Sequence, residues 1–107
     1  MKINLIEKDL IQDNQIEIIF VKSVDGLGDS EILEILDFKA KDESCILLAE
    51  SKKIYIGYEE SSYDSLAIAS ATAIKKLQTT KFENAKIILN EDLKANFKGL
   101  IEGLFLG

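Results

Sequence analysis

The sequence contains no histidine, arginine, proline or tryptophan, and its only cysteine is Cys45. Without histidine, the chain lacks the most frequent general base and the most frequent transition-metal ligand of enzymes. Without arginine, it lacks the forked side chain that binds phosphate or guanine through two hydrogen bonds. A single cysteine excludes an internal disulfide and is typical of a reducing cytosol. These absences indicate a cytoplasmic protein with little catalytic equipment.

Long apolar segments are also missing, because no run approaches the roughly 20 residues of a membrane-spanning helix. The first residues lack the apolar stretch and the cleavage site of a signal peptide. The 107 residues are 47% hydrophobic and 30% charged, which predicts one folded domain over 1–107. The net charge of −6 repels a phosphate backbone. We therefore expect a soluble acidic domain that binds neither nucleic acid nor membranes.

The hydrophobic pattern predicts an α/β fold in which a mixed β-sheet is flanked by helices. Short segments rich in apolar or β-branched residues predict strands at 1–6, 16–21, 45–49, 54–58 and 85–89. Helical spacing predicts helices around 32–36, over 62–78 and after Asn90. The predicted order is β-β-α-β-β-α-β-α. The continuous apolar run at 16–21 predicts a strand buried on both faces. The helix over 62–78 is expected to connect two parallel strands.

Local signals define the two longer helices. Ser61 and Asp64 match the serine-x-x-acid capping box, and Asn90 is a good cap for the last helix. The apolar face of the helix over 62–78 is expected to hold Tyr63, Ala67, Ala71, Ile74 and Leu77. The apolar face of the last helix is expected to hold Leu93, Phe97, Leu100, Ile101 and Leu104. Phe105 and Leu106 extend it, and we expect them to be exposed, as at the cut end of a longer chain.

Three blocks in the second half of the chain carry a family resemblance. They are a hairpin strand ending near glycine at 53–58, the segment LAIASATAIKKLQTTKFENAKIIL at 66–89, and a glutamate-glycine-x-x-leucine-glycine stretch at 102–107. In order and spacing they resemble the amino-terminal domain of the leucyl aminopeptidase family (cytosol aminopeptidase, peptidase family M17). Residues 1–50 fit by strand order alone, and the region 26–44 is shorter than in most members of the family.

The resemblance implies a macro-domain-like fold and a non-catalytic role. In this family the domain precedes a catalytic domain and lies at the outside of a homo-hexamer. The parent would be a cytoplasmic metalloprotease that removes amino-terminal residues from peptides. It would use two divalent ions, zinc or manganese, to activate water and polarise the scissile carbonyl. The family's metal-binding residues have no counterpart in this chain, so no catalytic, cofactor-binding or metal-binding residue is assigned within it. The implied partners are its own catalytic domain and the other subunits.

Three pairs of adjacent acids are candidate ligands of a hard cation, namely Asp42-Glu43, Glu59-Glu60 and Glu91-Asp92. The last pair falls in an expected first helical turn and the second pair lies just before one, where the helix dipole explains them without a metal. Adjacent helical side chains also point about 100° apart rather than at one ion. We therefore expect the three pairs to be structural.

A glycine-containing loop and the cysteine are further candidates. The stretch Asp25-Gly26-Leu27-Gly28-Asp29 follows a strand and precedes a helix, as a nucleotide-binding loop does. It lacks the third glycine, and its aspartates would repel a phosphate, so an ordinary turn is favoured. Cys45 lies in an apolar strand, and the chain has no histidine to activate it as a nucleophile. A buried structural thiol is the favoured interpretation.

Tyr55, Tyr58 and Tyr63 lie close in sequence to Lys52 and Lys53 and could stack on nucleic-acid bases. Half-buried tyrosines at a hairpin edge are the simpler interpretation. The favoured function is therefore the non-catalytic domain of a leucyl aminopeptidase, which packs on the catalytic domain and supports assembly. The alternative is a free-standing macro-like module that binds a nucleotide or an ADP-ribose derivative. A small interaction domain without a ligand is a third possibility.

Overall fold

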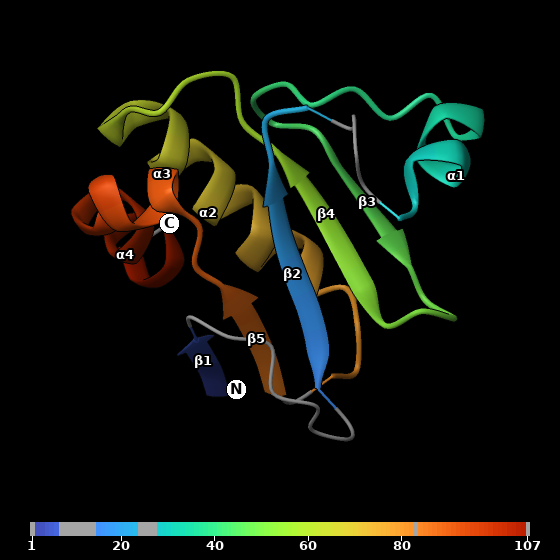
Figure 1. The fold of residues 1–107 in the computed structure, drawn as a ribbon. Coiled ribbons are helices and arrows are strands. Elements are labelled where there is room, and N and C mark those ends of the chain that lie inside the picture. Colours follow the sequence, from blue (N-terminus) through green and yellow to red (C-terminus); the bar gives the residue numbers. More distant parts are fainter. Residues whose placement is uncertain (1, 7–14, 24–27, 83, 107) are drawn as a thin grey trace.

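The computed structural model describes residues 2–6, 15–23, 28–82 and 84–106, which form a five-stranded mixed sheet with helices against it (Figure 1). The order across the sheet is β1-β5-β2-β4-β3. The first four strands in this order run parallel, and β3 pairs antiparallel with β4. The strands are β1 Lys2–Ile6, β2 Ile16–Val21, β3 Cys45–Leu48, β4 Lys53–Gly57 and β5 Asn84–Ile88.

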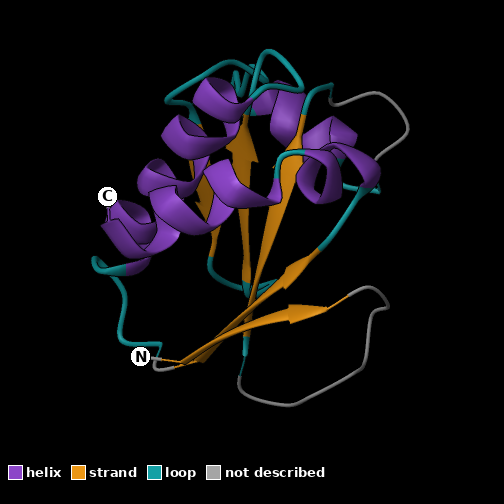
Figure 2. Cartoon of the chain, turned by 90° about the vertical axis from the view of Figure 1, so that its left-hand side faces the viewer, coloured by secondary structure: helices purple, strands orange, loops and turns teal. Residues whose placement is uncertain are grey.

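In the described ranges four helices accompany the sheet: α1 Ser30–Ile35, α2 Tyr63–Leu77, α3 Glu91–Ala95 and α4 Phe97–Leu106. Helices α2 and α4 pack against each other along one face of the sheet (Figure 2). Helix α1 lies near β3, and its buried residue Leu33 packs with Val21 and Tyr55 of the sheet (Figure 1). None of the described helices has both the length and the apolar character that a membrane crossing requires.

The two faces of the sheet bury separate apolar clusters. The larger cluster lies under α2 and α4 and includes Ile16, Ile18, Ile54, Ile56, Leu66, Ala69, Ala73, Leu77, Ile87 and Leu100. The smaller cluster, on the opposite face, consists of Val21, Leu33, Phe38 and Tyr55 with partly buried neighbours. Strand β2 contributes to both clusters, because alternate side chains of a strand point to opposite faces. Its predicted burial is confirmed on the face toward α2, whereas on the opposite face Val21 is buried but Glu17 and Ile19 are only partly buried. Strand β2 is the central strand of the sheet.

The α/β class with a mixed sheet is confirmed, and the element order differs from the predicted one at the last helix. This helix is interrupted at Asn96, whose backbone leaves the helical region (φ −117°, ψ 35°). Its amide donates hydrogen bonds to the carbonyl of Asp92 and to the hydroxyl of Ser61. Asn90 caps α3 as predicted, since its side chain accepts a hydrogen bond from the amide of Leu93 at 2.8 Å. Phe105 is 64% exposed, as expected.

The predicted apolar face of α2 is wrong by about one residue. The buried side chains of α2 are Ser65, Leu66, Ala69, Ser70, Ala73 and Leu77. Tyr63 is 43% exposed instead. Because this helix carries small or apolar residues on every side, its sequence does not fix which side meets the sheet. The cap also differs from the predicted box, because Ser62 rather than Ser61 accepts the hydrogen bond from the amide of Ser65.

Two glycines of α4 bring it against α2. A β-carbon added at Gly103 would lie 2.3 Å from the carbonyl oxygen of Ala67 and 2.6 Å from the β-carbon of Ser70. One added at Gly99 would lie 2.6 Å from the carbonyl oxygen of Tyr63. Glycines four residues apart share one helix face, so together they form a flat strip for the backbone of α2. The small residues of α2 therefore pack against a helix as well as against the sheet.

Candidate functional site

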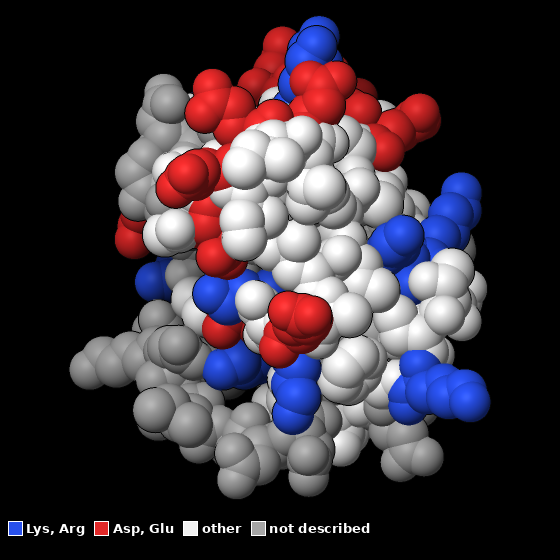
Figure 3. Space-filling view, turned by 90° about the vertical axis from the view of Figure 1, so that its right-hand side faces the viewer, with Lys and Arg blue, Asp and Glu red and all other residues white. Residues whose placement is uncertain are grey.

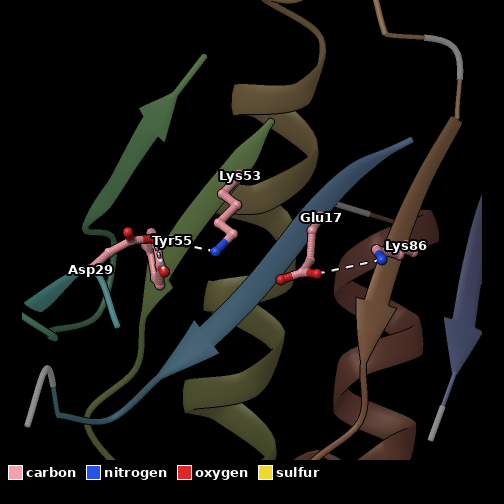
Figure 4. Close-up of polar contacts among 5 residues, drawn as sticks. All are labelled: Glu17, Asp29, Lys53, Tyr55 and Lys86. Atoms are coloured by element: carbon pink, nitrogen blue, oxygen red, sulfur yellow. Dashed lines mark hydrogen bonds and ion pairs between the residues drawn. The ribbon is translucent and has the colours of Figure 1, made fainter. Parts of the chain in front are cut away.

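A polar network lies on the face of the sheet opposite α2 (Figure 4). The hydroxyl of Tyr55, on β4, donates a hydrogen bond to Asp29 Oδ2 at 2.6 Å. Lys53 Nζ lies 3.4 Å from the same oxygen. Asp29 occupies the N-cap position of α1, but its side chain makes no capping hydrogen bond. Its carboxylate instead ties the start of α1 to the sheet.

The ionisation of this pair follows from its contacts. The hydrogen bond from Tyr55, helped by the charge of Lys53, holds the pKa of Asp29 below its usual value. Burial, reinforced by the hydrogen bond to Asp29, raises the pKa of Tyr55. The side chain of Tyr55 is 2% exposed, so its hydroxyl stays protonated inside the fold. This aspartate is an anion held in place by a buried donor.

Charges of alternating sign continue across three neighbouring strands. Lys86 on β5 and Glu17 on β2 are register partners, and Lys86 Nζ lies 3.5 Å from Glu17 Oε1. Glu17 is also the register partner of Lys53 on β4. The side chains of Lys86 and Glu17 are only 9% and 15% exposed. Opposite charges on adjacent strands favour this register over a slipped one, so these three charged residues help to fix the register of β5, β2 and β4.

A second tyrosine–aspartate pair lies where β4 and β5 end. The hydroxyl of Tyr58 donates to Asp92 Oδ2 at 2.8 Å, and the amide nitrogen of Asn90 lies 3.5 Å from the same hydroxyl. The hydrogen bond from Tyr58, with a further one from Ser61, lowers the pKa of Asp92. Burial, and then the bond to Asp92, raises the pKa of Tyr58 to about 12. The pair therefore anchors α3 to the end of β4.

The buried tyrosines should make the protein less stable in alkali. An unfolded tyrosine loses its proton near pH 10. Since the folded-state pKa of Tyr58 is about 12, the unfolded chain loses protons first, and the free energy of unfolding should fall as the pH rises from about 10 to 12. Tyr58→Phe should make this fall shallower in urea titrations at several pH values. The exposed Tyr63→Phe is the control and should keep the original slope; a Tyr58→Phe protein with an unchanged slope would contradict the assignment.

Two of the predicted acid pairs meet at the start of α2. Asp42 Oδ1 accepts hydrogen bonds from the amide of Glu59 at 2.9 Å and from the hydroxyl of Ser65 at 2.6 Å. Glu59 Oε2 in turn accepts from the amide of Asp42 at 3.4 Å. Ser65 Oγ also accepts from the amides of Glu59 and Glu60 at 3.2 Å. Among the described residues, no three acidic or sulfur ligands converge on a point where a metal ion could sit.

The remaining candidates have different surroundings from those expected. The interpretation of half-buried tyrosines is wrong for Tyr55 and Tyr58, which are both 2% exposed and have no ring face free to stack on a base. Cys45 is partly exposed rather than buried, because it lies on the edge strand β3. Of the glycine loop, residues 25–27 lie outside the described residues. Gly28 is exposed, and Asp29 is engaged with Tyr55.

The charged groups of this site therefore contact one another across elements and link α1 and α3 to the sheet. The tyrosine–aspartate pairs were missed in the sequence because the partners lie 26 and 34 residues apart. Aspartates next to expected helix starts are the only local signal, and that signal fits a cap equally well. No family model matches the chain, and no curated protein matches it.

Proposed function

We propose that the chain is the non-catalytic amino-terminal domain of a cytoplasmic leucyl aminopeptidase, with a macro-domain-like fold. The domain packs on a catalytic domain and supports assembly of a homo-hexamer. The parent enzyme holds two divalent ions in its catalytic domain and removes amino-terminal residues from peptides. Residues 1–107 bind neither the metal ions nor the substrate.

The observation that carries this proposal is the contact between two of the blocks that resemble the family. Gly103, from the block at 102–107, lies against Ala67 and Ser70, from the block at 66–89. The third block, 53–58, contains β4, which is joined to β5 through β2 and through the crossover helix α2. The three blocks thus form one packing unit of helices and parallel strands. A resemblance confined to residues that pack together is stronger support than three scattered matches of common types.

The charge distribution disfavours the alternative, a nucleotide or ADP-ribose module. Ligands of α/β folds bind beyond the carboxyl ends of the parallel strands. Among the described residues at those ends, Lys22 follows β2, Glu59 and Glu60 follow β4, and Glu91 and Asp92 follow β5, so the acids outnumber the lysine. These four carboxylates repel a pyrophosphate. Titration calorimetry separates the two proposed functions. Heat of binding at micromolar ADP-ribose would favour the nucleotide-binding module, whereas we expect no heat of binding up to millimolar ADP-ribose.

The peptidase proposal predicts activity in the complete gene product and none in residues 1–107 alone. With added manganese or zinc, the complete protein should hydrolyse leucine p-nitroanilide, and a chelator should stop it. With the isolated domain, purified in the same way, the rate of leucine p-nitroanilide hydrolysis should equal the rate in buffer alone. A complete protein without chelator-sensitive hydrolysis contradicts the proposed parent. Chelator-sensitive turnover that copurifies with residues 1–107 contradicts the non-catalytic role.

A further inference from the structure

The edge strand β3 leaves part of its backbone without a partner strand. Gly57 donates a backbone hydrogen bond to the carbonyl of Ser44 at 2.9 Å. Successive residues of an antiparallel strand alternate between facing the partner and facing away. In this register the N–H and C=O groups of Cys45 and Leu47 therefore point outward, away from β4. Within the described part of the chain no strand lies beyond β3.

Nothing in the sequence of β3 protects this edge. Its four residues, Cys-Ile-Leu-Leu, include no charge, and the chain has no proline at all. Natural sheets usually protect an open edge with a lysine, a proline or a bulge, because an open edge pairs readily with another strand. The short length of β3 limits such pairing, but its apolar residues carry neither a charge nor a proline, so its outward backbone groups can accept a strand.

A groove of about 600 Å³ lies beside this edge, between β3 and α2. Its apolar part is formed by Cys45, Ile68 and Ala71. Lys75 and Lys76 line the end toward the C-terminus of α2, and no described carboxylate forms an ion pair with either. Glu43 lines the groove just before β3 begins. Figure 3 faces this edge and shows a band of uncharged surface, with acidic side chains along its top and upper left, lysines along its right-hand border and further charged side chains of both signs in its lower centre.

We propose that β3 and this groove bind an extended peptide segment of another protein by adding it as a sixth strand. The backbone of Cys45 and Leu47 supplies the main-chain hydrogen bonds, and alternate apolar side chains of the peptide enter the groove. An acidic side chain of the peptide lies against Lys75 and Lys76, and Glu43 excludes a second acid at the opposite end. The inference does not rest on the proposed aminopeptidase role.

The first experiment measures binding of a defined probe. The probe is a fluorescein-labelled hexapeptide, threonine-valine-threonine-valine-glutamate-glutamate, tested with its reversed sequence because the strand can add in either direction. Fluorescence anisotropy should show saturable binding of at least one of them. In the two-dimensional amide NMR spectrum, the signals of Cys45 and Leu47 should shift and exchange more slowly with solvent. Failure of both peptides to bind at millimolar concentration would overturn the proposal.

Modified peptides and variants test the mode of binding. N-methylation of every second residue blocks one edge of a strand, so one of the two possible N-methylated sets should abolish binding and the other should preserve it. Lys75→Glu should weaken binding at least about tenfold, the factor that corresponds to 1.4 kcal/mol. Lys98→Glu, an equal charge change on α4, should leave it nearly unchanged. Equal tolerance of both N-methylated sets, equal effects of the two variants, or a dimer formed through β3 would contradict the proposal.

Discussion

Replacing Gly103 by valine should lower the free energy of unfolding by about 3 kcal/mol, the upper end of the usual cost of overpacking a core. A β-carbon at this position would meet the backbone of Ala67 and the β-carbon of Ser70 at distances that real side chains do not adopt. Neither neighbour can rotate away, because one is a backbone carbonyl and the other is the root of a buried side chain. Helices α2 and α4 must therefore move apart, which opens the apolar cluster between them.

The matched control is Gly28→Val, because a β-carbon at Gly28 would have no atom within 4 Å. That change should alter stability by less than about 0.5 kcal/mol, as exposed substitutions usually do. Urea denaturation of both variants, followed by circular dichroism, gives the comparison. Equal stabilities for the two valine variants would show that α4 does not approach α2 as described. They would also remove the main support for treating the resembling blocks as one unit.

Ser65→Ala should cost about 2–3 kcal/mol, because it leaves several polar groups without their partner at once. The hydroxyl of Ser65 donates to Asp42 and accepts from the amides of Glu59 and Glu60. It is 3% exposed, so water cannot readily replace it. The loss should appear as a lower midpoint in urea with an unchanged slope.

Ser70→Ala is the corresponding control in the same helix. Ser70 is also fully buried, but its hydroxyl bonds only to the carbonyl of Leu66 within α2. Alanine keeps the β-carbon that packs near Gly103 and has the higher helix propensity, by about 0.5 kcal/mol. Ser70→Ala should therefore be nearly neutral. If both alanine variants lose the same free energy of unfolding, the loss comes from deleting a buried hydroxyl in general. The hydrogen bonds of Ser65 to Asp42, Glu59 and Glu60 would then not be its cause.

The positions of the strands and of the longer helices could be predicted from the sequence, because they depend on local patterns of residues. The apolar run of β2 and the cap at Asn90 are examples, since each structure depends on residues only a few positions apart in the sequence. The interruption at Asn96 was not predictable in this way. It depends on hydrogen bonds from its amide to Asp92 and to Ser61, and Ser61 lies 35 residues earlier in the chain.

The strand order could not be predicted from the sequence either, because it depends on contacts between residues that are far apart in the chain. Strand β1 pairs with β5 rather than with β2, its neighbour in the chain, and of the described strands only β3 runs antiparallel to its partner. Alternating charges at Lys86, Glu17 and Lys53 mark this order, but they become a signal only when the strands are already aligned. The tyrosine–aspartate pairs are likewise products of the fold.

The most direct measurement for the proposed function is the coding sequence downstream of codon 107. If the chain is the amino-terminal domain of a leucyl aminopeptidase, the reading frame continues into a larger domain. That domain carries the family's metal-binding lysine, aspartates and glutamate together with its asparagine-threonine-aspartate-alanine-glutamate-glycine-arginine stretch. A stop codon directly after codon 107, or a continuation without these residues, contradicts the proposal.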